Sequence, residues 1–257
     1  MKFEYKKSLG QNFLMDGNKI NQILNAIDCN SDDLIVEIGP GAGAITKGLV
    51  KKDCQILCFE IDTRLKEILL SINSKNLKVI FCDFLNADLN KYIDYKKYKR
   101  IIFVGNLPYY ITTAIINKII DYGHADEIII MVQKEVADRF MAKPHSKKYN
   151  SLSVYLQYNF DIMKVCDVSK NCFEPIPKVD SIVIKLKKHN KYYVKDENKF
   201  YNFVKDSFKQ KRKNLKNNLR GYDLIKLEKI LNGMGKNLTI RAESLSIDDF
   251  IKISNEL

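Results

Sequence analysis

The stretch LIVEIGPGAGAIT, residues 34–46, gives the clearest indication of the fold in this chain of 257 residues. It begins with a run that is apolar apart from Glu37, which is typical of a strand buried on both faces of a sheet. Gly39, Gly41 and Gly43 follow. Glycine adopts positive φ readily and lets a ligand approach the main chain, and a doubly wound α/β sheet binds its ligand at such a loop. The stretch therefore predicts an α/β protein with a nucleotide-like cofactor.

The glycine loop differs from two phosphate-binding motifs. A dinucleotide fingerprint, G-x-G-x-x-G, would need glycine at position 44, where the chain has Ala44. The loop also lacks the G-K-[ST] ending of a P-loop. The expected cofactor is therefore one without phosphate groups.

Two acidic residues lie at the ends of the next two predicted strands. Glu60 lies in the strand at 55–61, 21 residues after Gly39, where a carboxylate accepts hydrogen bonds from ribose hydroxyls. Asp83 follows the strand at 78–82 and can accept a hydrogen bond from an adenine amino group. Each acid alone is more typical of an ordinary strand end, but together they predict S-adenosyl-L-methionine, which has ribose and adenine and no phosphate.

The remaining strands complete a sheet of mixed direction. Apolar runs at 101–105 and 127–132 are separated by helix-length segments, which indicates parallel strands covered on both faces. Residues 160–168 and 180–187 are predicted strands with no helix between them, and such strands pair antiparallel. We therefore expect a mostly parallel sheet that ends in an antiparallel hairpin.

A polar linker at residues 189–199 separates two regions of different pattern. Beyond it the chain is predicted to be helical throughout, so we expect a larger domain, 1–188, and a small all-α domain, 189–257. Of the net charge of +12, a share of +9 lies in residues 185–257, which hold 18 Lys and Arg against 9 Asp and Glu. This asymmetry predicts a polyanionic partner, nucleic acid before membrane.

Two helices of the small domain have clear signals. The spacing of apolar residues predicts the first over 200–219, with Gly221 as its cap. A capping box of Ser246 and Asp249 opens the last, over 247–255. Basic residues cluster on the first helix, where they would follow RNA phosphates, although a charge run is more often a solvated helix face: Lys209, Lys211, Arg212, Lys213, Lys216 and Arg220.

The tetrapeptide NLPY, residues 106–109, follows the fourth predicted strand and so emerges at the same edge as the glycine loop. The exocyclic amine of a base is a poor nucleophile, because its lone pair is delocalised into the ring. The side-chain oxygen of Asn106 and the main-chain carbonyl of Leu107 can accept its two N–H groups and free that lone pair. Pro108 would fix the turn and Tyr109 would stack on the base. Alone the motif is as typical of an ordinary β-turn, but the glycine loop favours catalysis.

A base must leave its stack to reach such a turn. Phe173, in the segment NCFEPIP, is the candidate for a second stacking ring, with a hydrophobic plug in a proline-rich turn as the alternative.

The cysteines, the histidines and the length of the apolar runs predict neither a metal site nor a membrane-spanning segment. The six cysteines form no C-x-x-C pair and the three histidines are scattered, so no metal site is expected. The apolar runs fall far short of the ~20 residues that span a bilayer, and the first residues lack the apolar stretch of a secretory signal. We expect a cytoplasmic protein.

Seven motifs are spread over essentially the whole chain: KSLGQNFL (7–14), VEIGPGAGAIT (36–46), FEID (59–62), CDFL (82–85), GNLPYYIT (105–112), FEPIPKVDS (173–181) and FKQKRKNLKNNL (208–219). Together they resemble the ribosomal RNA adenine N6-dimethyltransferase family. The resemblance implies a Rossmann-like methyltransferase sheet with a small all-α C-terminal domain. KSLGQNFL and the basic tail look like the small-subunit branch of the family, which dimethylates two adjacent adenosines in the 3′-terminal hairpin of small-subunit rRNA.

The resemblance also implies residue roles that spacing does not. The cofactor-binding residues would be Asn12, Leu14, Gly39, Gly41, Glu60, Ile61, Asp83, Phe84 and Asn106. The implied partner is small-subunit rRNA within an immature small ribosomal subunit, bound by a monomer. Many relatives have asparagine after the NLPY tyrosine, where this chain has Tyr110.

Two alternatives stay open. The first is the same chemistry on large-subunit rRNA, as in the macrolide-resistance branch. The second is a non-catalytic rRNA-binding assembly or transcription factor on the same fold, although a pure binder has no need of acceptors that activate an amine.

Overall fold

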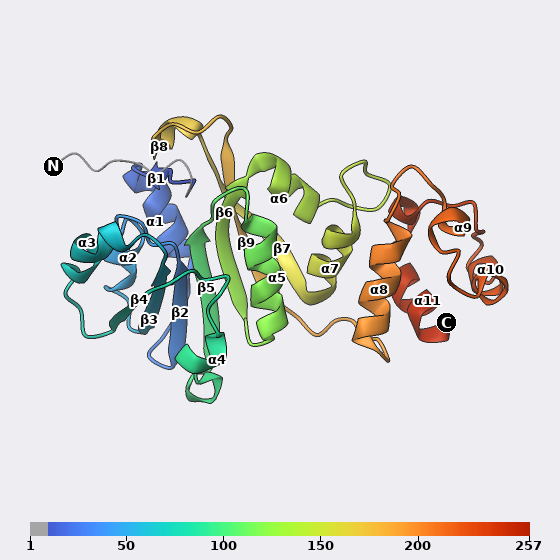
Figure 1. Ribbon diagram of the computed structural model, residues 1–257, viewed down its shortest axis with the longest axis horizontal. Coiled ribbons are helices and arrows are strands. Elements are labelled where there is room, and N and C mark those ends of the chain that lie inside the picture. The colour runs from blue at the N-terminus through green and yellow to red at the C-terminus, as the bar shows by residue number, and fades with distance from the viewer. Residues whose placement is uncertain (1–9) are drawn as a thin grey trace. The chain divides into compact units, whose positions relative to one another are not determined.

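The structure is a computed structural model that describes residues 10–257, so Lys7, Ser8 and Leu9 of the KSLGQNFL motif lie outside the described residues. The chain divides into two compact units. The sheet unit holds the described residues up to Lys134 together with Met163–Lys188, and the helical unit holds Glu135–Ile162 and His189–Leu257. Each unit is described separately (Figure 1).

A seven-stranded sheet forms the centre of the sheet unit, in the order β4-β3-β2-β5-β6-β9-β7. The pairs β2·β3, β2·β5, β3·β4 and β5·β6 are parallel, whereas β6 and β9 pair antiparallel. The predicted fold class, a mostly parallel sheet that ends in an antiparallel hairpin, is confirmed. The strands are β2 (Asp33–Ile38), β3 (Gln55–Glu60), β4 (Leu77–Phe81), β5 (Arg100–Asn106), β6 (Glu127–Gln133), β7 (Phe160–Val168) and β9 (Ser181–Lys188).

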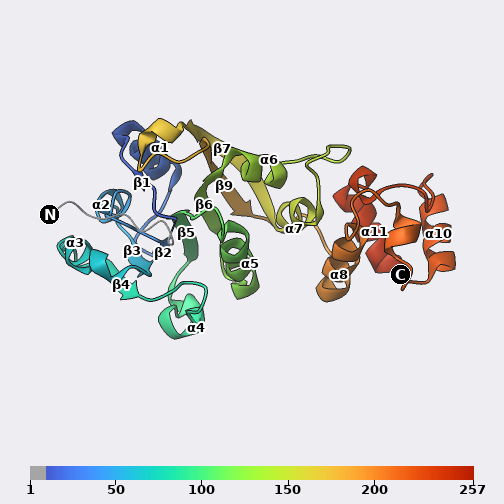
Figure 2. The same cartoon turned by 45° about the horizontal axis from the view of Figure 1, so that its top comes forward.

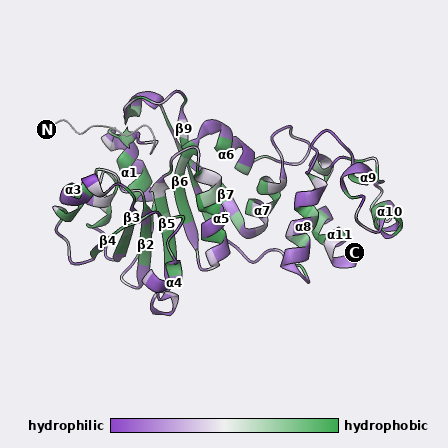
Figure 3. Ribbon diagram, in the orientation of Figure 1, coloured by the Kyte–Doolittle hydropathy of each residue, from purple (hydrophilic) through white to green (hydrophobic). Residues whose placement is uncertain are grey.

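Helices cover both faces of this sheet (Figure 2). The central strands are apolar on both faces because both are buried, and hydrophobic residues accordingly run along them (Figure 3). On one face Ile102 and Val104 of β5 pack with Ile23 of the first helix. The helices of this unit are α1 (Gly17–Ala26), α2 (Thr46–Leu49), α3 (Lys66–Leu70), α4 (Leu89–Tyr92) and α5 (Thr112–Tyr122). A further helix, α6 (Lys134–Phe140), belongs to the helical unit except for its first residue.

A second, two-stranded sheet brings the N-terminal segment to the same unit. Strand β1 (Phe13–Leu14) pairs antiparallel with β8 (Phe173–Glu174), so that Leu14 lies opposite Phe173. The Met15 N–H extends this pairing by donating to the carbonyl of Cys172 at 2.8 Å. Two motifs that are distant in sequence, KSLGQNFL and FEPIPKVDS, are thereby joined.

The helical unit has its own hydrophobic core. Its helices are α7 (Ser151–Asn159), α8 (Glu197–Ser207), α9 (Leu215–Asn218), α10 (Leu224–Asn232) and α11 (Ile247–Glu256). Tyr149, Val154 and Tyr158 lie in this core with Phe200 and Phe250, which is why residues Glu135–Ile162 group with the C-terminal helices. The domain boundary expected after residue 188 stays a prediction.

The expectation of one helix over 200–219 is wrong. Helix α8 ends at Ser207, a loop follows, and α9 begins at Leu215. The side chain of Asn218 holds the loop, since its Nδ2 donates to the Ser207 carbonyl at 2.7 Å and its Oδ1 accepts from the Gln210 N–H at 3.0 Å. The capping box of the last helix is confirmed, with Ser246 and Asp249 bonded in both directions.

Within residues 10–257, none of the helices combines the length and the apolarity that a membrane span requires.

Candidate active site

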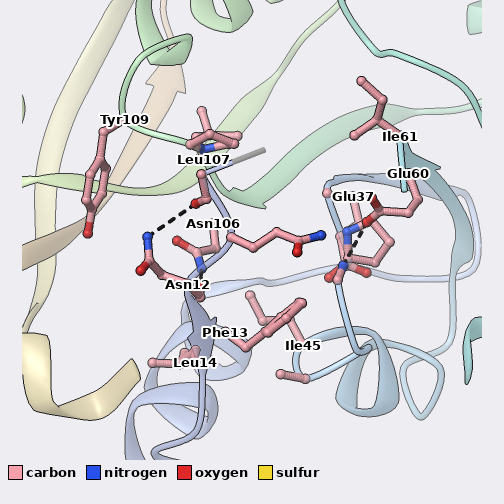
Figure 4. A pocket seen from close by; sticks show the side chains of 17 residues that line it. Asn12, Phe13, Leu14, Glu37, Ile45, Glu60, Ile61, Asn106, Leu107 and Tyr109 are labelled. Carbon is pink, nitrogen blue, oxygen red and sulfur yellow. Dashed lines mark hydrogen bonds between the residues drawn. The ribbon is translucent and has the colours of Figure 1, made fainter. Parts of the chain in front are cut away.

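A pocket opens at the carboxyl ends of β2, β3 and β5, where the sequence predicts the ligand (Figure 4). Its walls come from three segments: residues 10–14, the glycine loop with Glu60 and Ile61, and residues 106–109. The register of the sheet explains this meeting, since Ile38 at the end of β2 lies opposite Gly105 at the end of β5. The glycine loop and the NLPY turn therefore start side by side.

Gly105 makes this close approach possible. A Cβ atom at this position would lie 2.8 Å from the Ile38 carbonyl oxygen and 2.9 Å from Cδ2 of Leu107. The first of these neighbours is main chain and cannot rotate away.

We expect Gly105→Ala to lower the free energy of unfolding by about 1–3 kcal/mol, the usual cost of overpacking. Urea unfolding monitored by circular dichroism would measure the change. Gly17→Ala is the matched control, because a Cβ there meets nothing within 4 Å at the start of α1, and it should leave stability equal or higher. Equal unfolding midpoints for the two variants would contradict this account of the strand contact.

The glycine loop has the backbone that only glycine adopts readily, with φ of 66° at Gly39, 58° at Gly41 and 78° at Gly43. Gly41 also makes room for Phe13, whose Cε1 would lie 2.6 Å from a Cβ at that position. The N-terminal segment therefore packs directly against the loop. The absence of a side chain at Gly41 is needed both for the turn and for this contact.

Glu60 closes the loop from the end of β3. Its Oε2 accepts the Gly41 N–H at 3.0 Å and its Oε1 accepts the Asp62 N–H at 2.8 Å. Each oxygen keeps a second lone pair, which can accept a hydrogen bond from a ribose hydroxyl in the pocket. Burial raises the pKa of this carboxyl, against the lowering effect of these hydrogen bonds. The described residues that line the pocket include no Lys or Arg, which fits a cofactor without phosphate.

Glu37 lies deeper, where it accepts a hydrogen bond from the Thr46 hydroxyl at 2.7 Å. Burial raises its pKa from 4.5 to about 7. A carboxyl whose pKa is higher in the folded than in the unfolded chain stabilises the fold at low pH, and this contribution is lost as the pH rises from about 4.5 to about 7.

We therefore expect Glu37→Gln, which mimics the protonated acid, to raise the free energy of unfolding at pH 8 by up to about 3 kcal/mol relative to the parent chain. The difference should shrink towards pH 5, as followed by urea unfolding at several pH values. Glu228→Gln on the exposed side of α10 is the control and should give no such trend. A Glu37→Gln curve parallel to the parent curve at all pH values would refute the assignment.

Asn106 has its amide oriented by the N-terminal segment. Its Nδ2 donates to the main-chain carbonyl of Asn12 at 2.8 Å (Figure 4). A carbonyl can only accept, so the NH₂ side of the amide must face Asn12 and the oxygen Oδ1 is left as an acceptor. The amide therefore has the orientation needed to accept a hydrogen bond from the N–H of an exocyclic amine.

The rest of the NLPY turn is equally fixed. The Pro108 carbonyl accepts the Thr112 hydroxyl at 3.0 Å and the Ile111 N–H at 3.2 Å. The Tyr109 hydroxyl and the hydroxyl of buried Ser181 are 2.9 Å apart. Burial raises the pKa of Tyr109. Ser181, the last residue of the FEPIPKVDS motif, thus holds the outer end of the ring that borders the pocket.

The chain as a whole is similar to known proteins. The sequence pattern of the family described as ribosomal RNA adenine dimethylase matches residues 2–257. The chain belongs to this dimethylase family. The protein named ribosomal RNA small subunit methyltransferase A in Aster yellows witches'-broom phytoplasma is 44% identical over 254 residues, which cover 97% of this chain and 94% of that protein. Its namesake in Bacillus mycoides is 41% identical, with coverage of 99% and 92%.

Solved structures show the same fold. A crystal structure of a dimethyladenosine transferase from Plasmodium falciparum matches with a TM-score of 0.76 and 23% identity, covering 93% of this chain and 95% of that one. The structure of the 23S rRNA methyltransferase ErmE matches with a TM-score of 0.76 and 24% identity, covering 96% and 99%. At these identities the likeness concerns the dimethylase fold alone.

The structure brings most of the predicted site residues of this dimethylase to the pocket. They are Asn12, Leu14, Gly39, Gly41, Glu60, Ile61, Asn106, Leu107, Pro108 and Tyr109.

Three predicted residues do not line the pocket. The carboxylate of Asp83 caps its own turn, accepting the Leu85 N–H at 2.9 Å and the Asn86 Nδ2 at 2.8 Å. Phe84 is 5% exposed and packs edge-on against other rings. Phe173 is 3% exposed and lies in the core cluster with Leu14, because its pairing in β8 turns the ring inward. The inward ring matches the plug alternative, and the stacking role stays a prediction.

The six predicted RNA-binding residues are all exposed, but they do not share one helix as expected. Residues 209–213 lie in the loop between α8 and α9, Lys216 lies in α9, and Arg220 follows it.

Seven residues that line the pocket were not predicted as site residues: Gly10, Gln11, Phe13, Glu37, Pro40, Ala44 and Ile45. Gln11 lines the pocket and its Nε2 donates to Asp62 at 2.7 Å, which ties the N-terminal segment to the end of β3. Asp62 has its pKa lowered to about 2, chiefly by hydrogen bonds from Arg64. Gln11 and Asp62 both belong to motifs of the family, KSLGQNFL and FEID, and this was the only signal in the sequence. Neither a glutamine nor an aspartate by itself indicates a role at the pocket.

Proposed function

We propose that this chain transfers methyl groups from S-adenosyl-L-methionine to N6 of two adjacent adenosines in the 3′-terminal hairpin of small-subunit rRNA. The observation that carries this proposal is the position of the Asn106 amide, which Asn12 orients and which lines the same pocket as the glycine loop. That loop is hydrogen-bonded to Glu60, the proposed acceptor for the ribose hydroxyls. The names of relatives at 41–44% identity support the small subunit as the target.

The residues around the pocket fit the cofactor. Glu60 would accept the ribose hydroxyls, and Ile61, half-exposed at the rim, would pack on the adenine. The glycine loop would approach the amino-acid portion, with Asn12 and Leu14 on the opposite side. When bound, the cofactor supplies an electrophilic methyl group on a sulfonium centre.

The chain's own contribution would be to activate and aim the amine. Oδ1 of Asn106 and the carbonyl of Leu107 would accept hydrogen bonds from the two N6–H groups, which keeps the nitrogen lone pair out of the ring. Tyr109, fixed at its hydroxyl by Ser181, would stack on the target base. In-line placement of nitrogen and methyl would supply much of the rate.

Three further residues are proposed to contact the cofactor or the target base although they do not line the pocket. Asp83 and Phe84 would border the adenine, which requires the Asp83 carboxylate to accept a further hydrogen bond beyond its own turn. Phe173 would support the target base from its second face only if its ring left the core cluster.

We propose that the protein acts as a monomer in the cytoplasm on an immature small ribosomal subunit. The exposed basic residues of the helical unit would contact the phosphates of the rRNA.

A transfer assay separates this function from its rivals. Methyl-labelled S-adenosyl-L-methionine would be incubated with the protein and either unmethylated immature small subunits or naked large-subunit rRNA. We expect label in the small-subunit rRNA. Label in the large-subunit rRNA alone would favour the macrolide-resistance chemistry, and binding to rRNA without any transfer would favour a non-catalytic factor.

A further inference from the structure

The helical unit contains a second lysine-rich loop next to the basic loop between α8 and α9. This second loop is residues 143–148, KPHSKK, and it follows α6. The ammonium of Lys211 donates to the main-chain carbonyl of Lys147. Two segments about 60 residues apart in sequence therefore form one surface.

Buried aromatic rings and main-chain hydrogen bonds hold both loops in place. The ring of Tyr149, buried at the end of the second loop, packs edge-on against Phe208 at the start of the basic loop, with centroids 5.9 Å apart. The His145 N–H donates to the Glu243 carbonyl at 2.7 Å, and the Tyr149 N–H donates to the Ser146 carbonyl at 3.0 Å. Both loops that form the shared surface are therefore anchored to the hydrophobic core of the helical unit.

The charges of the second loop are not equivalent. Lys148 forms an ion pair with Asp138 at 2.6 Å, and the neighbouring Arg139 pairs with Glu135. Among the ion pairs of residues 10–257, none involves Lys143 or Lys147, and both side chains are exposed. Neither loop contains an Asp or Glu.

We propose that Lys143 and Lys147 bind rRNA phosphates together with Lys211, Arg212 and Lys213, so that the RNA surface of this unit includes both loops. This inference rests on the proposed rRNA substrate. Unpaired lysines release counterions from a polyanion, whereas a lysine already paired with a carboxylate contributes less. A membrane is a poorer fit, because these two loops expose none of the large apolar side chains that anchor a protein in a bilayer.

The test is the salt dependence of binding by the full chain to small-subunit rRNA. The slope of log K against log salt falls by about 0.7–0.9 for each phosphate that the protein no longer neutralises. We expect Lys143→Ala/Lys147→Ala to reduce the slope by about 1.5 and to weaken binding roughly tenfold at low salt. Alanine at 147 keeps the main-chain carbonyl that accepts Lys211, so the basic loop should stay in place.

Lys91→Ala/Lys96→Ala is the matched control. It removes the same charge from exposed lysines. These lysines lie in and just after α4, close to the start of β5, whereas the pocket lies at the carboxyl ends of the strands (Figure 1). The control should leave the slope unchanged. Unfolding temperatures of both variants would show that the fold is intact.

A slope for Lys143→Ala/Lys147→Ala equal to that of the control would overturn the inference. If Lys211→Ala/Arg212→Ala/Lys213→Ala still weakened binding in that case, the proposed rRNA substrate would stand and only the second loop would be excluded. A parent chain with no salt-dependent binding to rRNA would instead refute the proposed function. A larger loss on phosphatidylserine vesicles than on rRNA would also overturn the inference.

Discussion

Replacing Asn106 by alanine is expected to lower the rate of methyl transfer by roughly 10²–10³-fold, as for the loss of one preorganised hydrogen-bonding group in an active site. The variant loses the acceptor for an N6 proton and the amide that the Asn12 carbonyl orients. Single-turnover transfer of labelled methyl groups to unmethylated small subunits would measure the rate.

Cofactor binding separates this effect from a damaged pocket. Asn106→Ala should change the affinity for S-adenosyl-L-methionine, measured by calorimetry, by less than about tenfold, or 1.4 kcal/mol. Asn106→Asp should fall between the parent and alanine, because it keeps an acceptor oxygen but cannot donate to Asn12. An Asn106→Ala variant with the parent rate would show that the amide does not activate the amine.

Replacing Glu60 by glutamine is expected to weaken cofactor binding by roughly 10–100-fold, because hydrogen bonds to a charged group contribute about 1.5–3 kcal/mol each. Glutamine has nearly the same size, but its NH₂ group would face the main-chain N–H of either Gly41 or Asp62. The variant therefore loses both an acceptor for the ribose and a support of the glycine loop. Calorimetric titration with S-adenosyl-L-methionine gives the affinity directly.

Glu67→Gln is the control for this second variant. Glu67 is exposed on α3, a few residues beyond the pocket, and its replacement should leave the affinity unchanged. An unchanged affinity for Glu60→Gln, with the fold intact, would exclude the carboxylate as the ribose acceptor.

Local sequence predicts those site residues that lie at the end of a strand. Gly39, Glu60 and Asn106 each lie at or just beyond the carboxyl end of a strand with a strong apolar run. Parallel pairing brings these ends to one edge, so the sequence order of the motifs translates into a shared pocket. The resemblance to a family was needed for Asn12 and Leu14, which reach the pocket through the β1·β8 pairing.

The parts that were predicted wrongly depend on contacts between distant residues. The apolar spacing through Leu219 suggested one helix, but Asn218 binds the carbonyls of Ser207 and Gln210 and stabilises a loop instead. The placement of Phe173 depends on its pairing with Leu14, about 160 residues earlier, which no local pattern reveals. Tertiary contacts of this kind override local propensity.

Product analysis of the methylated rRNA would show which nucleoside the chain modifies and at which positions. Small-subunit rRNA from the transfer reaction would be digested, and the labelled nucleosides and their positions identified. We expect N6,N6-dimethyladenosine at two adjacent positions of the 3′-terminal hairpin with the parent chain, and a large loss of label with Asn106→Ala. Label on another nucleoside, or only on large-subunit rRNA, would contradict the proposed function.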